Sequence, residues 1–176
     1  MTGAKCVESR GWNCTYRGPL LIHSAKKWTG DLQRICLTAP FRQTLAETGI
    51  PIPPAPHSWT TEDNRRLKED GYGLAFGAII GRVDVVGCFP AEEVRITESS
   101  RYHETPILDE RPGAKLEISS REQAFGDYSI GRWAILCASP VRFPEPIFLP
   151  GMQGIFEVDP ADERIPERFR GLLAGG

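Results

Sequence analysis

Three ionisable side chains of mixed sign lie within six residues near the start of the chain. Lys5, Glu8 and Arg10 follow Gly3 in the spacing G-x-K-x-x-E-x-R. An arginine offers bidentate hydrogen bonds to a phosphate or a base edge, and a lysine offers a point charge or, when buried, a base. A carboxylate between two cations can bridge them or accept a proton from a substrate. The spacing therefore allows a site for a polar or anionic ligand, or an ion-pair network that only stabilises the fold.

The alternation of side chains along a strand decides which of these groups can meet. If this segment is a strand, Cys6, Glu8 and Arg10 share one face and Val7 lies on the other. Lys5 has the parity of Val7, so it joins Glu8 only if it lies in the turn before the strand, or at a twist or bulge.

The positive charge of the chain is concentrated near its N-terminus. Residues 1–27 contain five cations and one acid, a net of +4, which leaves −6 for the remainder of a chain whose formal charge is −2. A local basic patch on a mildly acidic body can hold phosphate without making the whole protein bind polyanions. The same charges can equally form a solvated surface.

Composition argues against several classes of protein. The 176 residues suit one globular domain, and no apolar run is long enough to span a membrane. Five cysteines without a C-x-x-C pair argue against a disulfide framework and a zinc site, and favour a reducing, cytoplasmic location. The phosphate-binding loops of nucleotide hydrolases and of dinucleotide-dependent enzymes are not present in the sequence. We expect no metal and no cofactor.

Other side chains could line the same site. Trp12 could stack on a base or plug the core, and a histidine at a strand end, such as His23, is more often a hydrogen-bonded core residue than a catalyst. Asp84 lies in a buried-looking strand, so its carboxylate needs a partner, for which Lys5 and Arg10 are candidates. Further candidates for ligand contact are Tyr16, Arg17, Lys26 and Tyr128.

The elements that would position these residues are short strands with a few helices between them. Period-2 and apolar patterns predict strands over 5–10, 18–23, 74–88, 133–138 and 155–158. Apolar spacing predicts a helix over 30–48 with a break near residue 39, and Thr60 to Asp63 predicts the cap of a helix that ends near Glu69. The strand-and-helix mixture indicates the α+β class.

Several stretches carry weaker patterns. The run 83–86 is almost all apolar, which predicts burial on both faces of its strand. Residues 89–121 are polar and predict a long irregular excursion, and residues 49–56 form a proline-rich loop that is either a recognition segment or a surface excursion. We expect prolines 140, 144, 146 and 150 to interrupt the chain before the last strand, and residues 159–176 to be an appended helix or a frayed tail.

These blocks together resemble the ASCH domain, a branch of the PUA-like superfamily. Its signature is G-x-K-x-x-E-x-R, which stands here as Gly3, Lys5, Glu8 and Arg10. Three further blocks in the same order are similar to later strands of the family: 16–26, 77–88, and 125–134 with 151–156. The resemblance spans most of residues 3–158, and it implies a small PUA-like β-barrel flanked by helices over residues 1–158.

The resemblance also implies a ligand. It predicts a cationic cleft that holds RNA or a modified nucleoside, with no role for a membrane. An alternative is a hydrolase of RNA or of an N4-acylated cytidine with Lys5 or Glu8 as catalytic base, since one bacterial branch deacylates N4-acetylcytidine. In that branch a threonine nucleophile matches Glu8, which is a departure. A second departure is that the family usually has a strand and a helix before the motif, so we expect an open sheet edge or a shallower pocket here.

Overall fold

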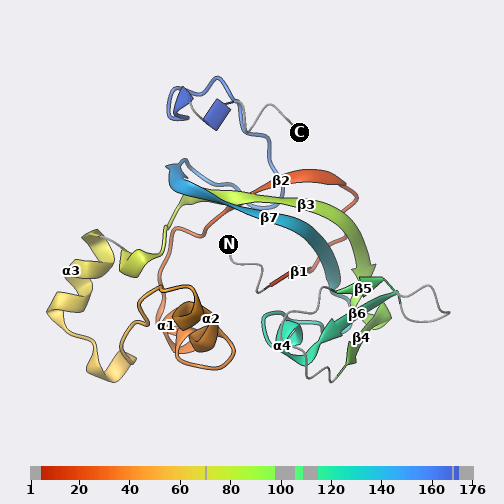
Figure 1. The fold of residues 1–176 in the computed structure, drawn as a ribbon, viewed down its shortest axis with the longest axis horizontal. Helices are drawn as coiled ribbons and strands as arrows, with labels where there is room; N and C mark the ends of the chain where they lie inside the picture. The colour runs from red at the N-terminus through yellow and green to blue at the C-terminus, as the bar shows by residue number, and fades with distance from the viewer. Residues whose placement is uncertain (1–4, 70, 98–105, 109–114, 168, 171–176) are drawn as a thin grey trace. The chain divides into compact units, whose positions relative to one another are not determined.

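The computed structural model describes residues 5–69, 71–97, 106–108, 115–167 and 169–170 (Figure 1). These residues divide into two compact units, and each is described by itself. Unit 1 is formed by Met1–Leu20 with Val83–Val141, and unit 2 by Leu21–Arg82 with Arg142–Gly176. The chain passes from one unit to the other within strands β2 (Gly18–His23), β3 (Ala78–Pro90) and β7 (Trp133–Phe148).

The strands form two sheets. β1 (Val7–Arg10) joins the three strands above in the order β1-β7-β3-β2. Three shorter strands form the second sheet, in which β6 (Leu116–Ser119) lies parallel to β4 (Val94–Thr97) and antiparallel to β5 (Ile107–Leu108). The α+β class is thereby confirmed. Within the described residues, however, both sheets are open, because the end strands of each order have no second partner, so the expected closed barrel is not found.

In unit 1, the first part of β7 packs against a hydrophobic cluster on each of its faces. β1 pairs antiparallel with β7, and Val7 lies opposite Leu136. Ala134 and Leu136 face one hydrophobic cluster, whereas Ile135 faces another, as the alternation of a strand requires. The first cluster contains Val7, Leu116, Ile118, Ala134 and Leu136; the second contains Cys14, Val85 and Ile135. Between β6 and the loop that leads to β7 lies one short helix, α4 (Ser120–Gln123).

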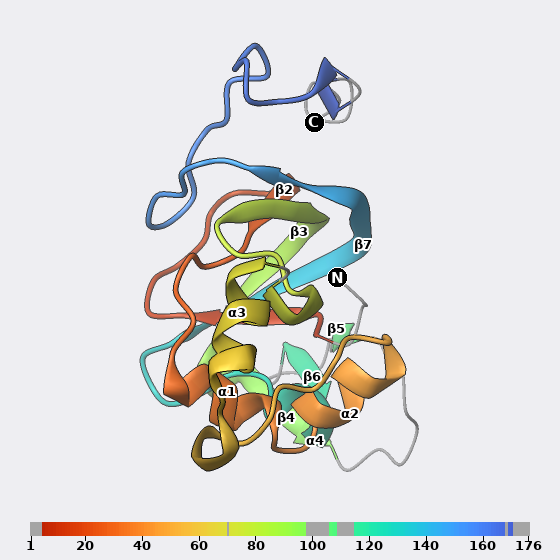
Figure 2. The same cartoon turned by 90° about the vertical axis from the view of Figure 1, so that its left-hand side faces the viewer.

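Unit 2 contains the three longer helices. α1 (Gly30–Cys36) and α2 (Phe41–Glu47) pack side by side (Figure 2), and the break between them confirms the expected one near residue 39. α3 (Thr61–Glu69) is the predicted capped helix: Thr60 Oγ1 accepts from the N–H of Asp63, and Asp63 Oδ2 accepts from the N–H of Thr60. The core of unit 2 contains Ile79, Phe143, Ile147, Leu149, Ile165 and Phe169. The last two lie in the segment that the sequence predicts as a tail.

Short 3₁₀ turns complete the chain. η1 (Pro56–Ser58) and η2 (Gly71–Gly73) flank α3, and η3 (Ala91–Glu93) precedes β4. The proline-rich loop before η1 packs within unit 2, since Pro53 is fully buried and the side-chain amide of Gln33 donates to the carbonyl of Pro54 at 2.8 Å. None of the described helices is both long and apolar enough to cross a bilayer.

Three expectations about the strands are wrong. The run 83–86 is not buried on both faces, because Val83 and Val85 point inward while the Val86 side chain is 46% exposed. The polar stretch 89–121 is not wholly irregular: it contains β4, β5 and β6, whose strands are too short to stand out from a polar background. Residues 155–158 are not a strand, and Ile155 is exposed.

The prolines before residue 150 do not interrupt the chain as expected, because β7 runs through three of them as a single strand of 16 residues. Pro144 and Pro146 stand two apart, so their missing N–H groups fall on the same edge of the strand. β1 pairs only with Trp133 to Leu136, so further along one edge of β7 has no partner from β1. Prolines are tolerated where no ladder bond is needed.

Candidate functional site

The candidate site is built on β1, in unit 1. Val7 and Ser9 are buried, whereas Glu8 and Arg10 alternate toward the other face, as the sequence predicts. Lys5 lies before the strand begins, so the alternation of side chains along β1 does not decide which way its side chain points. The first residue of the motif, Gly3, lies outside the described residues.

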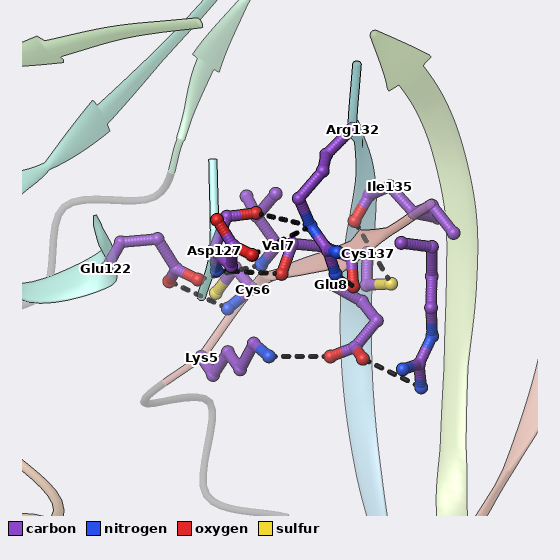
Figure 3. A network of polar contacts seen from close by, with 11 residues as sticks. Lys5, Cys6, Val7, Glu8, Glu122, Asp127, Arg132, Ile135 and Cys137 are labelled. Carbon is purple, nitrogen blue, oxygen red and sulfur yellow. Dashed lines mark hydrogen bonds and ion pairs between the residues drawn. The ribbon is translucent and has the colours of Figure 1, made fainter. Parts of the chain in front are cut away.

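Glu8 joins the two cations of the motif. Its Oε2 lies 2.6 Å from Lys5 Nζ and its Oε1 lies 2.8 Å from Arg10 Nη2, so each carboxylate oxygen faces one cation (Figure 3). The side chains of Lys5, Glu8 and Arg10 are 33%, 36% and 52% exposed. Ion pairs this exposed contribute only about 0–1 kcal/mol to stability. The network therefore orders the two cations more than it stabilises the fold.

A buried carboxylate from α4 holds the backbone of the same segment. Glu122 is 6% exposed, and its two oxygens accept from the N–H groups of Cys6 and Val7 at 2.8 and 2.9 Å (Figure 3). Burial raises the pKa of Glu122, while the two N–H groups and Lys5 act in the opposite direction. Ser119 caps α4 by accepting from the N–H of Glu122, so S-x-x-E stands here without the usual reciprocal bond, because the glutamate binds β1 instead.

The turn before β7 holds the other end of β1. The N–H of Asp127 donates to Ser9 Oγ at 3.0 Å, and Arg132 donates from Nη2 to the carbonyl of Ser9 at 3.4 Å and from Nε to the carbonyl of Asp127 at 3.0 Å. Together with Glu122, these bonds cover the edge of β1 that faces away from β7. The open edge that the resemblance predicts is thus covered by side chains and a turn, not by another strand.

The loop after β1 carries two exposed aromatic side chains. Trp12 is 39% exposed and Tyr16 is 40% exposed, so Trp12 is not the core plug that was the alternative. Arg17 donates from Nη1 to the carbonyls of Cys14 and Tyr16 at 2.8 and 2.7 Å, and Tyr16 donates its hydroxyl to the carbonyl of Pro19. Cys14 is buried and anchors the loop. The loop is therefore ordered by its own bonds.

Tyr128 lies beside β1 but is not part of the ion-pair row. Its ring packs on the cluster around Val7, its hydroxyl is buried without a described hydrogen-bond partner, and its pKa is raised by burial and by Glu122 and Glu8. A shallow hollow of about 560 Å³ lies next to it. This hollow is lined by Ile96, Gln123, Ala124, Gly126, Asp127, Tyr128 and Ser129, and by neither Lys5 nor Arg10.

Three predicted residues stand apart from the row. Asp84 is half-buried and has no hydrogen bond or ion pair with any described residue, so the expected pairing with Lys5 or Arg10 is wrong: both cations are held by Glu8. His23 and Lys26 belong to unit 2. His23 Nε2 lies 2.8 Å from the carbonyl of Leu149, which is the structural role that a histidine at a strand end usually has, and Lys26 is exposed.

The thiols of unit 1 gather near the same segment. Cys137 lies opposite Cys6 across the β1–β7 ladder, and its N–H donates to the carbonyl of Cys6 at 2.8 Å. Burial, followed by the charge of Glu8, raises the pKa of Cys137 to about 12, and burial raises the pKa of Cys6 as well. Thiols of this kind are poor nucleophiles at neutral pH. Among the described residues, no group of three His, Cys, Asp or Glu side chains is arranged to hold a metal ion.

Sequence reasoning found the ion-pair row but missed Glu122, Ser9, Asp127 and Arg132. The one signal for Glu122 was the S-x-x-E spacing at 119–122, which predicts a helix start but not a bond to a strand more than 100 residues earlier. No family model matches the chain, and no curated protein is similar to it in sequence.

Proposed function

We propose that unit 1 binds single-stranded RNA or a modified nucleoside, through a cationic surface defined by Lys5, Arg10 and Arg17 and flanked by Trp12 and Tyr16. The observation that carries this proposal is the row Lys5–Glu8–Arg10, in which one carboxylate pairs with a cation on β1 and with another just before it. With Arg17, the surface has three cations against one exposed carboxylate, a local charge of +2 in a chain of net charge −2.

The two exposed aromatic rings support a nucleic acid over a simple anion. Single-stranded nucleic acids are bound by cations that follow the phosphates and by aromatic side chains on which the bases stack. Trp12 and Tyr16 lie in one ordered loop with Arg17, directly after Arg10. The resemblance to the ASCH domain, with its PUA-like fold, points to the same class of ligand.

Binding is better supported than hydrolysis. A catalytic base needs a lone pair directed at its substrate, but both oxygens of Glu8 already accept from cations at 2.6 and 2.8 Å. Hydrolysis of RNA or of an N4-acylated cytidine at this row is the weaker proposal, since Glu8 would first have to release a cation to act as a base.

Fluorescence anisotropy with a short single-stranded RNA tests the proposal. The double variant Lys5→Ala/Arg10→Ala should lose binding at low salt while keeping its circular dichroism. The matched control is Arg34→Ala/Arg65→Ala, which removes two cations that are also exposed and ion-paired, to Asp31 and to Glu62 and Glu69, but that lie in unit 2. Equal loss of affinity in both double variants would mean that only net charge matters.

A second titration separates polymer from monomer ligands. If the RNA does not bind to the folded wild-type protein, calorimetry with cytidine and N4-acetylcytidine tests whether the ligand is a nucleoside. If the wild type shows a heat of binding that disappears in Lys5→Ala/Arg10→Ala, the site is the proposed one and its ligand is a nucleoside. No heat with either nucleoside would end the proposal.

A further inference from the structure

We infer that Glu122 is a positioning residue for the proposed RNA-binding surface: its carboxylate clamps the backbone of Cys6 and Val7 and thereby fixes Lys5 and Glu8. This inference rests on the proposed function, and it assigns a role to a residue that lies outside the motif. Glu122 does not contact the ligand in this account.

The clamp is defined by geometry. The N–H of Cys6, the residue before β1, and the N–H of Val7, the first residue of β1, donate to the two oxygens of one carboxylate, at 2.8 and 2.9 Å. Val7 is fully buried, so water cannot replace the carboxylate at its N–H. An amide buried without a partner costs about 1–3 kcal/mol. Lys5 and Glu8 immediately flank the clamped residues, so their backbone is fixed by the same two bonds.

The charges around the clamp set how it responds to pH. Glu122 faces Lys5 and Glu8 from the motif, the Cys6 thiol from the residue before β1, and the Tyr128 hydroxyl from the turn after α4. Only the ionised carboxylate can accept from both N–H groups without presenting a proton to one of them. The pKa of Glu122 is raised, so the clamp becomes complete at a higher pH than an ordinary carboxylate would require.

Affinity and stability should therefore change in opposite directions with pH. A carboxyl whose pKa is raised in the folded state contributes stability below its unfolded pKa and loses that contribution as pH rises through the folded value. RNA affinity should instead rise over the same interval as the clamp closes. If Glu122 supported the fold alone, affinity would not rise over this interval.

The experiment compares wild-type protein with Glu122→Gln, whose side chain has one acceptor oxygen and a competing NH₂ group. The probe is a short oligouridine, because its uracil bases do not titrate near neutral pH. Glu92→Gln is the matched control: this carboxylate also accepts a backbone N–H, from Gly131 at 2.9 Å, but not from β1. Amide exchange at Cys6 and Val7 is measured on the same samples.

We expect Glu122→Gln to bind oligouridine about tenfold more weakly at neutral pH, to lose the rise of affinity with pH, and to exchange the two amides faster. Glu92→Gln should show none of these three changes.

Unchanged amide exchange at Cys6 and Val7 would overturn the clamp. Faster exchange with unchanged RNA affinity would overturn the role of the clamp in binding. If Glu122→Gln does not fold, the pH series on the wild type alone decides, since affinity that falls with pH contradicts the inference. If the wild type binds no RNA at any pH, the proposed function fails, while exchange still tests the clamp.

Discussion

At the scale of single residues, the same side chains can be read as chemistry or as structure, and geometry decides between them. Glu8 has the residue type of a base, yet both of its oxygens are occupied by cations. Glu122 has the surroundings of a functional acid, since it is buried beside Lys5, yet its oxygens are occupied by backbone amides. Lys5 and Arg10 each have more N–H donors than their bond to Glu8 uses. With the exposed rings they can meet a ligand, which favours recognition over turnover.

The Cys137 thiol offers a prediction that depends on its environment alone. Because burial raises the pKa of Cys137 to about 12, almost none of it is thiolate at mildly alkaline pH, and the thiolate is the nucleophile. Iodoacetamide should therefore leave Cys137 unmodified in the native protein and alkylate it in urea, as peptide mass spectrometry would show. Rapid native alkylation would mean that this part of β7 opens readily.

At the scale of elements, local patterns predicted those whose signals are local. The caps and breaks at Thr60 and near Pro40 come from neighbours in sequence, and α1, α2 and α3 were predicted accordingly. The prediction that Glu8 and Arg10 share one face of β1 needed only the alternation of side chains along that strand. β4 to β6 were missed because strands of two to four residues carry too few apolar positions, although Leu116 and Ile118 do alternate. The Glu122 clamp was missed because it joins residues far apart in sequence.

The cap of α3 gives a prediction at this scale. Thr60→Ala removes the hydroxyl that accepts from the N–H of Asp63 at 3.2 Å, and loss of such a cap costs about 0.5–2 kcal/mol. Urea unfolding should show this destabilisation, while RNA affinity stays unchanged because α3 lies in unit 2. Thr61→Ala, the next residue along, is the control and should cost less. Equal losses in the two variants would mean that the hydroxyl bond contributes nothing.

At the scale of the whole molecule, the distribution of charge limits where a polyanion can bind, and the strand order decides whether the sheet closes into a barrel. A chain with net charge −2 has no general affinity for polyanions, so RNA binding must come from the local excess near the N-terminus. The α+β class could be predicted from the mixture of patterns. Closure of a barrel could not, because the pairing of end strands is decided by contacts between distant segments, and within the described residues those ends are open.

The most direct test of the central claim is the salt dependence of RNA affinity. Each phosphate contact on a single strand contributes about −0.7 to the slope of log affinity against log salt concentration. Contacts from Lys5, Arg10 and Arg17 therefore predict a slope of about −2, which should drop to about −0.7 in Lys5→Ala/Arg10→Ala. A slope near zero, or one that the double variant leaves unchanged, would contradict the account, because the phosphates would then be held elsewhere or not at all.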